Sequence, residues 1–188
     1  EGYNDIENTY DGDTGVKLSF MKRLIYSLYY KDYKMFFSGN IDENSKILIN
    51  RNVLDRVRIV APFLTYEEDP QVVVSDKGEI KWIIDAYTTS DKYPYSQNFS
   101  GVNYVRNSIK VIVDAYTGDV SFYIIDETDP IAQTYKKIYP GLFSNEKIPE
   151  DLVNHLTTPE GLFKIQTEVY QRYHLNDAGQ FYDQADVW

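Results

Sequence analysis

The chain has 188 residues, enough to bury one well-packed core or two small ones, and its 43% hydrophobic content excludes a disordered protein. A net charge of −10 argues against a nucleic-acid partner and against electrostatic docking on anionic lipid headgroups. The chain has no cysteine, so we expect no disulfide framework, thiolate nucleophile or cysteine metal site. This cysteine usage fits an extracytoplasmic bacterial setting.

Residues 1–15 are polar and acidic, which predicts a flexible N-terminal tail. Asp11 and Asp13 are spaced as at the start of a calcium loop, but the twelfth position would be Lys22, where calcium needs a bidentate glutamate. We therefore predict a solvated tail without calcium. Because the chain starts at Glu1 and has no run of about 20 apolar residues, we expect a processed or excised piece without a membrane span.

Helical spacing of apolar side chains extends from residue 16 to residue 61. A first pattern recurs at three- and four-residue intervals, and a second, aromatic one covers residues 29–37. Residues 41–61 predict a further helix, which Pro62 ends because the residue before a proline avoids helical geometry. The apolar positions of the first pattern are Leu18, Met21, Leu24, Ile25 and Leu28.

The most regular feature of the sequence is a doubled stretch. Residues 80–88 are Ile-Lys-Trp-Ile-Ile-Asp-Ala-Tyr-Thr, and residues 109–117 are Ile-Lys-Val-Ile-Val-Asp-Ala-Tyr-Thr. Both alternate with period two, which is typical of β-strands. One face of each is wholly apolar and the other mixes isoleucine with Lys, Asp and Tyr. We predict two strands with one buried face and one half-exposed face.

Turn signals place each copy of the doubled stretch in a hairpin. Asp76-Lys77-Gly78 separates residues 72–74 from the first copy, and Gly118-Asp119 follows the second copy. Gly-Asp suits a two-residue hairpin loop because glycine accepts a positive φ. We expect both hairpins to lie in one antiparallel sheet, preceded by a linker over residues 63–71.

Beyond the hairpins the chain is predicted to be helical. Asp129-Pro130 and Thr158-Pro159 each combine a capping residue with a proline suited to the first helical turn, and Pro149 can open a short helix between them. Three aromatic residues near the end of the chain are spaced as docking anchors. They are Phe181, Tyr182 and Trp188.

The predicted fold class is therefore α+β, an antiparallel sheet of two hairpins with helices before and after. Residues 16–188 form a single predicted domain. Its parts are a helical segment 16–61, the sheet 72–126, a helical segment 129–175 and an extended C-terminal anchor 176–188.

The loop between the two strands, residues 88–101, combines three aromatic residues with many hydrogen-bonding side chains. Loops carry binding functions more often than strands do, so we predict a ligand contact surface here. The alternative is that Tyr93 and Tyr95 only pin a long loop to the body, with Pro94 fixing the backbone. The candidate ligand-binding residues are Tyr87, Asp91, Tyr93, Tyr95, Asn103, Arg106 and Asn107.

Catalytic side chains are hard to place in this sequence. His155 and His174 lack the short local spacing of zinc ligands, so we predict no metal and no cofactor. Asp85 and Asp114 are equivalent in the doubled stretch, and paired carboxylates can perform acid–base chemistry. The alternative is a structural role, in which both aspartates cap turns or accept hydrogen bonds from tyrosines.

Long motifs cover the chain from about Leu18 onward. Residues 82–97, Trp-Ile-Ile-Asp-Ala-Tyr-Thr-Thr-Ser-Asp-Lys-Tyr-Pro-Tyr-Ser-Gln, resemble the signature of uncharacterised protein family 0182, whose members are large bacterial integral membrane proteins. The sequence departs from the family pattern at 155–161, where Arg-Tyr is expected before the proline. The other matching segments are 50–52, 56–57, 61–64, 101–108, 113–116, 129–130, 139–143, 173–174 and 181–182.

The resemblance implies a parent protein in the cell membrane with a large region on the extracytoplasmic side, of which this chain is a soluble piece. It supplies no catalytic residue. We predict a binding or interaction module whose partners are other domains of the parent and a cell-wall glycan or peptide, without membrane contact by this piece. The alternatives are a cell-wall hydrolase using Asp85 or Asp114, and a passive spacer with apolar surface near Leu18 or Trp188.

Overall fold

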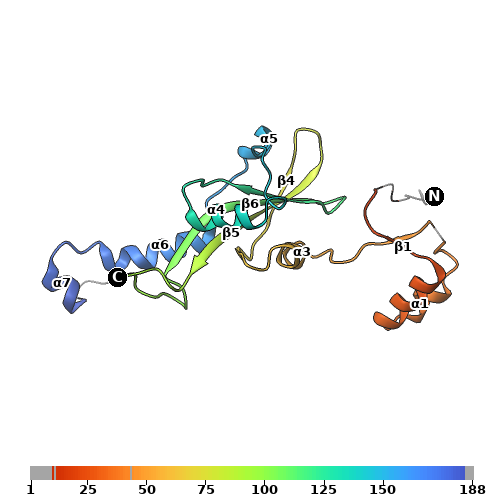
Figure 1. Cartoon of the computed structure of the whole chain (residues 1–188), viewed down its shortest axis with the longest axis horizontal. Helices are drawn as coiled ribbons and strands as arrows, with labels where there is room; N and C mark the ends of the chain where they lie inside the picture. The colour runs from red at the N-terminus through yellow and green to blue at the C-terminus, as the bar shows by residue number, and fades with distance from the viewer. Residues whose placement is uncertain (1–9, 11, 43, 185–188) are drawn as a thin grey trace, which may run out of the picture.

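The computed structural model describes residues 10, 12–42 and 44–184 of the chain. Its centre is an antiparallel sheet with the strand order β3-β5-β6-β7, and β4 pairs with the part of β5 that β3 leaves free (Figure 1). The strands are β3 (Thr65–Tyr66), β4 (Gln71–Val74), β5 (Ile80–Ser90), β6 (Tyr104–Asp114) and β7 (Val120–Ile124).

Two hairpins supply four of these strands, which confirms the predicted α+β class. β4 and β5 form the first hairpin, and β6 and β7 form the second. The two copies of the doubled stretch pair with each other, with Lys81 opposite Asp114 and Asp85 opposite Lys110. The predicted linker over 63–71 is wrong in part, because β3 lies within it and pairs with β5.

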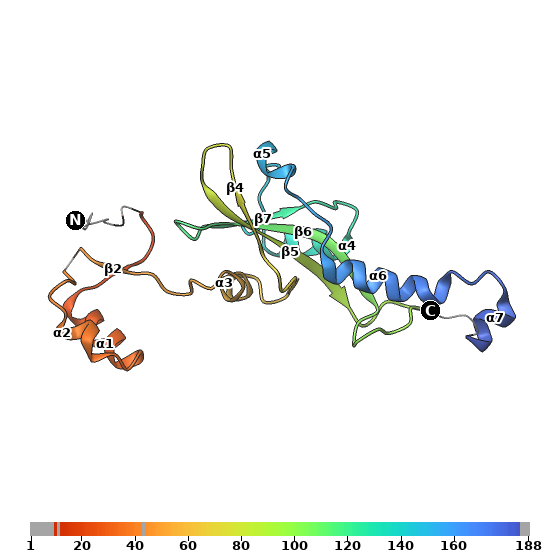
Figure 2. The ribbon, with the colours of Figure 1, turned by 180° about the vertical axis from the view of Figure 1, so that it is seen from behind.

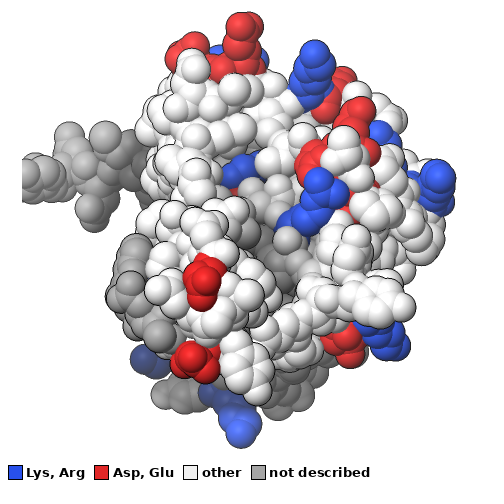
Figure 3. Space-filling model, turned by 90° about the vertical axis from the view of Figure 1, so that its left-hand side faces the viewer, with Lys and Arg blue, Asp and Glu red and all other residues white. Residues whose placement is uncertain are grey.

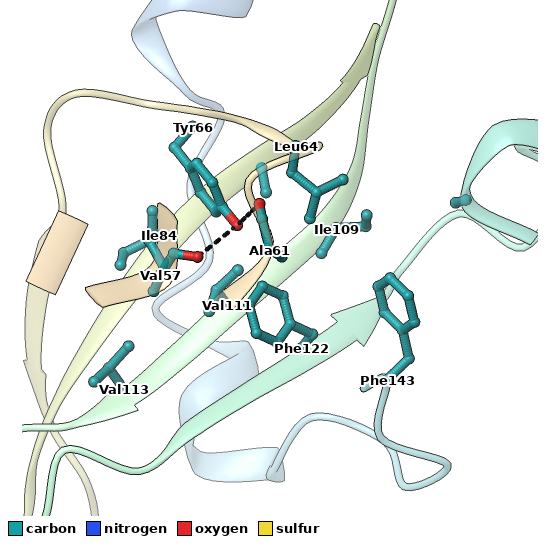
Figure 4. Close-up of a cluster of buried hydrophobic side chains, with 12 residues drawn as sticks. Val57, Ala61, Leu64, Tyr66, Ile84, Ile109, Val111, Val113, Phe122 and Phe143 are labelled. Atoms are coloured by element: carbon teal, nitrogen blue, oxygen red, sulfur yellow. Dashed lines mark hydrogen bonds between the residues drawn. The ribbon is translucent and has the colours of Figure 1, made fainter. Parts of the chain in front are cut away.

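One face of the sheet packs against α3 (Val53–Val60) and α4 (Pro130–Ile138). Ile84, Val111 and Phe122 are at most 1% exposed at the centre of this core (Figure 4). The Tyr66 hydroxyl donates to the carbonyl oxygens of Val57 at 3.1 Å and of Ala61 at 2.8 Å, as Figure 4 shows. This buried tyrosine therefore joins β3 to the end of α3.

The opposite face of the sheet is more deeply covered than the sequence predicts. Ile83 and Ile112 form a second core with Val73 of β4 and Leu152 of α5 (Glu150–Val153). The mixture of polar and apolar residues on this face predicts half exposure. The prediction fails for the two isoleucines, which are 3% and 7% exposed, because α5 and its flanking residues lie over them.

α3 begins at Val53, so the helix predicted from residue 41 is wrong over 41–52. The Asn52 side chain accepts hydrogen bonds from the backbone amides of Leu54 and Asp55, at 3.0 and 3.1 Å, and so caps the helix. Upstream, β2 (Lys46–Ile47) pairs instead with β1 (Val16–Lys17).

The second copy of the doubled stretch leaves the sheet earlier than the first. β6 ends at Asp114, whose carboxylate accepts hydrogen bonds from the amides of Tyr116 at 2.8 Å and Thr117 at 2.6 Å. Gly118 follows at φ +77°, with the Arg56 guanidinium 2.8 Å from where a Cβ would lie. The chain therefore turns through residues 115–119, in place of the predicted two-residue loop.

The C-terminal part is helical where an extended anchor was predicted. α6 (Glu160–Tyr173) begins after Pro159, which occupies the N-cap itself, so Thr158 is not the cap. α7 (Ala178–Asp183) follows, and its Phe181 ring lies 5.6 Å from Tyr173 of α6. The predicted docking of Tyr182 is wrong, since this side chain is 87% exposed, and Trp188 lies outside the described residues.

A helical hairpin in the N-terminal part of the chain stands apart from the sheet. α1 (Phe20–Tyr29) and α2 (Tyr33–Phe37) form this α1–α2 hairpin, which lies, with β1 and β2, at the end of the molecule opposite α7 (Figures 1 and 2). Of the predicted tail, residues 1–9 and Asp11 lie outside the described residues. Within residues 10, 12–42 and 44–184, no helix is long and apolar enough to cross a membrane.

Candidate functional site

The contact loop predicted over residues 88–101 begins later in the structure, because β5 extends to Ser90. The loop between β5 and β6, residues 91–103, is held by the Asn103 side chain. The Asn103 side chain accepts a hydrogen bond from the Tyr93 amide at 2.9 Å and donates to the Tyr93 carbonyl at 2.8 Å. It also donates to the Ser96 carbonyl at 3.3 Å, and the Ser96 hydroxyl returns a bond to the Asn103 carbonyl at 2.9 Å. One side chain therefore fixes the loop backbone at both Tyr93 and Ser96.

The two tyrosines of the loop differ in their surroundings. The Tyr93 ring stacks on Tyr104 of β6, with centroids 5.3 Å apart and an interplanar angle of 23°. Tyr95 is fully exposed, and its backbone has φ +59°, a conformation that costs energy for a residue other than glycine. Tyr93 thus matches the anchor hypothesis, while Tyr95 is presented to solvent.

Behind the loop, Asp129 collects hydrogen bonds from three elements. Its buried carboxylate accepts from the hydroxyls of Thr88 at 2.5 Å and Tyr104 at 2.8 Å, and from the Ile131 amide at 2.9 Å. Burial raises the pKa of Asp129, but the hydrogen bonds from Thr88, Tyr104 and the Ile131 amide outweigh it and hold the pKa below its usual value. The sequence-predicted N-cap of α4 is therefore also the polar centre of this end of the sheet.

The remaining predicted binding residues fall into different places. Asp91 is exposed just after β5. Arg106 pairs with Asp126 at 2.8 Å and donates to the Thr128 hydroxyl at 3.0 Å, which ties β6 to the turn before α4. The Asn107 amide donates to the Ala86 carbonyl at 3.5 Å, within the sheet. The partners of Arg106 and Asn107 in these contacts lie outside the 91–103 loop.

Tyr87 is 6% exposed and joins the sheet to α6. Its hydroxyl donates to Glu67 Oε2 at 2.5 Å, and the Gly161 amide donates to the same oxygen at 3.1 Å. Burial, followed by the hydrogen bond to Glu67, raises the pKa of Tyr87 far above its usual value. The side chain is therefore neutral and structural, and it does not share a surface with Tyr95.

Each of the two aspartates of the doubled stretch pairs with a lysine on the neighbouring strand. Lys81 Nζ lies 2.6 Å from Asp114, and Lys110 Nζ pairs with Asp85 and also donates to the Thr157 carbonyl at 3.2 Å. In the β5–β6 register the two aspartates are four residues apart, roughly 13 Å along the strands. Glycosidase carboxylates stand about 5–10 Å apart, so this arrangement favours the structural role.

A cleft of about 550 Å³ lies between the 91–103 loop and α6. It is lined by side chains that offer amides, a hydroxyl, a carboxylate and aromatic rings. They are Ser96, Gln97, Asn98, Phe99, Glu168, Val169, Gln171 and Tyr173. Figure 3, which views the molecule from the α7 end, shows a hollowed and mostly uncharged face with acidic and basic side chains scattered over it.

The α6 wall of this cleft is absent from the sequence-predicted site. Val169 and Tyr173 lie one turn apart on α6 and are 44% and 58% exposed. Helical spacing places Glu168 and Gln171 about 100° or more around the helix from Val169 and Tyr173, so no periodic signal in the sequence groups these four side chains. Sequence alone does not say which loop these side chains face.

A larger cavity, about 840 Å³, lies between residues 14–16, the segment 48–60 and the turn after β6. Trp82 and Tyr116 line it together with Arg51 and Arg56. Arg56 Nη1 donates to the carbonyl of Asn50 at 3.3 Å, and its guanidinium packs against Gly118. At least one of the two arginines that line this cavity therefore stabilises the fold.

Across the described residues, no group of three or more His, Cys, Asp or Glu side chains is arranged to hold a metal ion. His155 follows α5, and its amide bonds to the Leu152 carbonyl at 3.1 Å. His174 occupies the C-cap of α6, where its ring lies 5.9 Å from that of Tyr170. The two histidines therefore belong to helix ends.

These features define an α+β protein with a loop-and-helix cleft. The chain belongs to the Uncharacterised protein family (UPF0182), whose family model matches residues 1–188. It is 49% identical over 189 residues to a UPF0182 protein of Clostridium acetobutylicum, covering all of this chain and 21% of that protein. No solved structure matches the chain.

Further relatives agree in extent. A UPF0182 protein of Methanospirillum hungatei is 50% identical over 195 residues, covering all of this chain and 22% of the relative. One from Caldicellulosiruptor saccharolyticus is 47% identical over 180 residues, covering 95% of this chain and 20% of the relative. The chain thus spans about a fifth of the length of the curated relatives that it matches, and their names state no function.

Proposed function

We propose that the chain is a non-catalytic binding module on the extracytoplasmic side of a membrane-anchored protein. The proposed ligand is a neutral, hydroxyl-rich chain of the cell-wall glycan class. The observation that carries this proposal is the cleft of about 550 Å³ between the 91–103 loop and α6. The resemblance to a family of integral membrane proteins supports the location.

The lining of the cleft suits sugars. Amide side chains both donate and accept hydrogen bonds, as sugar hydroxyls do, and Gln97, Asn98 and Gln171 supply three of them. Phe99 and Tyr173 add ring faces on which the apolar face of a sugar ring can pack. Polar groups that converge on a concave wall fix the orientation of a ligand, and aromatic rings beside them add apolar contact.

The loop that forms one wall is fixed before any ligand arrives. Asn103 holds the backbone of Tyr93 and Ser96, so the side chains that follow are displayed from a constrained segment. Ordering a loop costs free energy, and a loop already ordered avoids that cost on binding. Tyr95, which directly precedes the lining residue Ser96 in the sequence, adds an exposed aromatic ring.

The cleft proposal is tested by a thermal-shift titration with soluble glycan-strand fragments of peptidoglycan. Ligand at about 100 times its Kd stabilises by about 2.7 kcal/mol, which raises the Tm by several degrees in a domain of this size. Tyr173→Ala and Gln171→Ala should remove the shift. Tyr182→Ala, at an exposed tyrosine outside the cleft, is the matched control and should keep it.

Short peptides that shift the Tm through Tyr173, with no response to glycan, would replace the sugar with a peptide ligand. No shift with either class would overturn the cleft as a binding site. A second candidate function, the spacer, is favoured by a separate observation. It requires apolar surface near Leu18, and the neighbouring helices α1 and α2 have such surface.

A further inference from the structure

The α1–α2 hairpin displays its apolar side chains outward. Met21, Ile25 and Leu28 recur at intervals of four and three residues on one face of α1, and they are 57–71% exposed. Phe37, at the end of α2, is 78% exposed. Scattered apolar residues are normal on a protein surface, but a contiguous apolar face on two adjacent helices indicates a docking site.

Internal hydrogen bonds fix this outward orientation. The Arg23 guanidinium donates to the carbonyls of Phe36 at 2.8 Å, and of Ser38 and Ile41 at 2.9 Å. The Ser27 hydroxyl is buried between the helices and donates to the Asp32 carbonyl at 2.7 Å. Polar groups, together with the edge-to-face contact between Phe20 and Phe36, therefore hold the two helices together. The side chains that remain outside are Met21, Ile25, Leu28 and Phe37.

The hairpin is also basic, in contrast to the rest of the chain. Residues 20–37 contain four basic side chains and one acidic side chain, a net charge of +3 against −10 for the whole chain. Lys22, Lys31 and Lys34 are exposed. The net charge of the chain argues against lipid docking only if the charge is evenly spread, and here it is not.

We propose that the α1–α2 hairpin docks on an anionic lipid bilayer and lies in the headgroup boundary. Its combination of exposed Phe, Met, Ile and Leu with tyrosines and lysines is typical of segments at a membrane–water interface. Tyrosine places its ring at the boundary, and lysine extends its charge toward headgroups. The proposal is independent of the cleft between the 91–103 loop and α6.

The position of the hairpin permits this contact. Figures 1 and 2 show α1 and α2 at one end of the molecule, beyond α3 and on the opposite side from α7 and the 91–103 loop. A flat bilayer can therefore meet the hairpin while the cleft stays accessible. A protein partner would not require the excess of lysine around the apolar face.

Co-sedimentation with lipid vesicles tests the lipid proposal. The chain should pellet with phosphatidylcholine vesicles that contain phosphatidylglycerol, and about tenfold less with phosphatidylcholine alone. Leu28→Ser combined with Phe37→Ser, and Lys31→Glu combined with Lys34→Glu, should each reduce pelleting by about tenfold. Lys137→Glu combined with Lys147→Glu changes the same charge at exposed sites elsewhere and should leave pelleting unchanged.

Folding of every variant is checked by circular dichroism, since all four hairpin positions are exposed and their replacement should leave the melting curve intact. Pelleting that is absent, or that survives both hairpin variants, overturns the proposal. Sedimentation equilibrium provides the alternative outcome. In that outcome, the chain forms a dimer that the double variant Leu28→Ser and Phe37→Ser dissociates, and it binds no vesicles. That result would make the hairpin a protein interface and overturn lipid docking.

Discussion

Asp129 shows how one side chain can serve a helix and a sheet together. The sequence predicts it as the N-cap of α4, and the structure confirms this through the bond from the Ile131 amide. The same carboxylate accepts bonds from Thr88 of β5 and Tyr104 of β6. Because Tyr104 also stacks on Tyr93, the cap supports the base of the 91–103 loop.

Replacing Asp129 with alanine should cost about 2–4 kcal/mol in the free energy of unfolding. The cost combines a lost helix cap with buried hydroxyls left without an acceptor. Urea denaturation at neutral pH measures it. Asp177→Ala removes the exposed cap of α7, whose carboxylate accepts from the Gln180 amide, and should cost about 1 kcal/mol or less. Equal costs at the two caps would contradict the network.

The same aspartate gives stability a pH dependence with a defined sign. Its pKa is lower in the folded protein than the usual 3.8, so the folded state favours the carboxylate. This stabilisation is fully present above pH 3.8 and is lost as the pH falls from there through the folded pKa. Asp129→Asn should flatten this part of the acid-unfolding curve.

At the scale of elements, the doubled stretch gives one tetrapeptide two conformations. Asp-Ala-Tyr-Thr is strand throughout 85–88 in β5, whereas at 114–117 only Asp114 belongs to β6 and residues 115–117 form a turn. In the first copy, Ala86 and Tyr87 pair with β3. In the second copy, the neighbouring strand β5 begins at Ile80, whose carbonyl accepts from the Ala115 amide. The residues after Ala115 therefore extend past the start of β5 and do not pair with it. The partner decides the conformation, not the local sequence.

The two cross-strand lysine–aspartate pairs should differ in their contribution to stability. Asp85→Ala leaves Lys110, whose side chain is 4% exposed, as a buried unpaired charge and should cost about 3–5 kcal/mol. Asp114→Ala leaves Lys81, which is 19% exposed and also pairs with Glu79, and should cost about 1–2 kcal/mol.

Urea denaturation of both variants gives the comparison. Asp85→Leu combined with Lys110→Met should recover most of the loss, because well-packed apolar groups replace a buried pair at little cost. A larger effect at Asp114 than at Asp85 would show that the turn contributes more than the buried pair. That result would contradict the ranking given by burial.

At the scale of the whole molecule, the α1–α2 hairpin and the sheet are stabilised by different means. The sheet has two apolar cores, one on each face. The hairpin is held by Arg23, which binds carbonyls on and beyond α2, and by Ser27. Segments with few buried apolar contacts open locally more readily than a packed core. The single domain over 16–188 stays a prediction.

Arg23→Ala should therefore loosen the hairpin alone. Amide hydrogen exchange in α1 and α2 should accelerate about tenfold, equivalent to about 1.4 kcal/mol, while the amides of β5 and β6 stay unchanged. Lys22→Ala, at the exposed neighbouring position, should have no such effect. Faster exchange throughout the sheet would indicate that the hairpin and the sheet unfold as one unit.

Local signals determined much of this protein. Period-two alternation and the turn at Asp76-Lys77-Gly78 predict the first hairpin, because strand and turn preferences act over a few residues. The cap at Asp129 predicts the start of α4 for the same reason. The aromatic and polar composition of residues 88–101 also indicated, as a candidate binding segment, the loop that forms one wall of the cleft.

Only the tertiary structure decided what lies opposite each of these parts. α6 forms the second wall of the cleft, although it lies far from the 91–103 loop in the sequence. Tyr87 is bound to Glu67, twenty residues earlier in the chain, and is therefore not part of the exposed surface. The helical spacing from Leu18 to Leu28 does not reveal which side chains are covered. Leu18 is 4% exposed, whereas Met21, Ile25 and Leu28 on α1 are 57–71% exposed. Burial depends on which elements meet, and local preference carries no information about the partner.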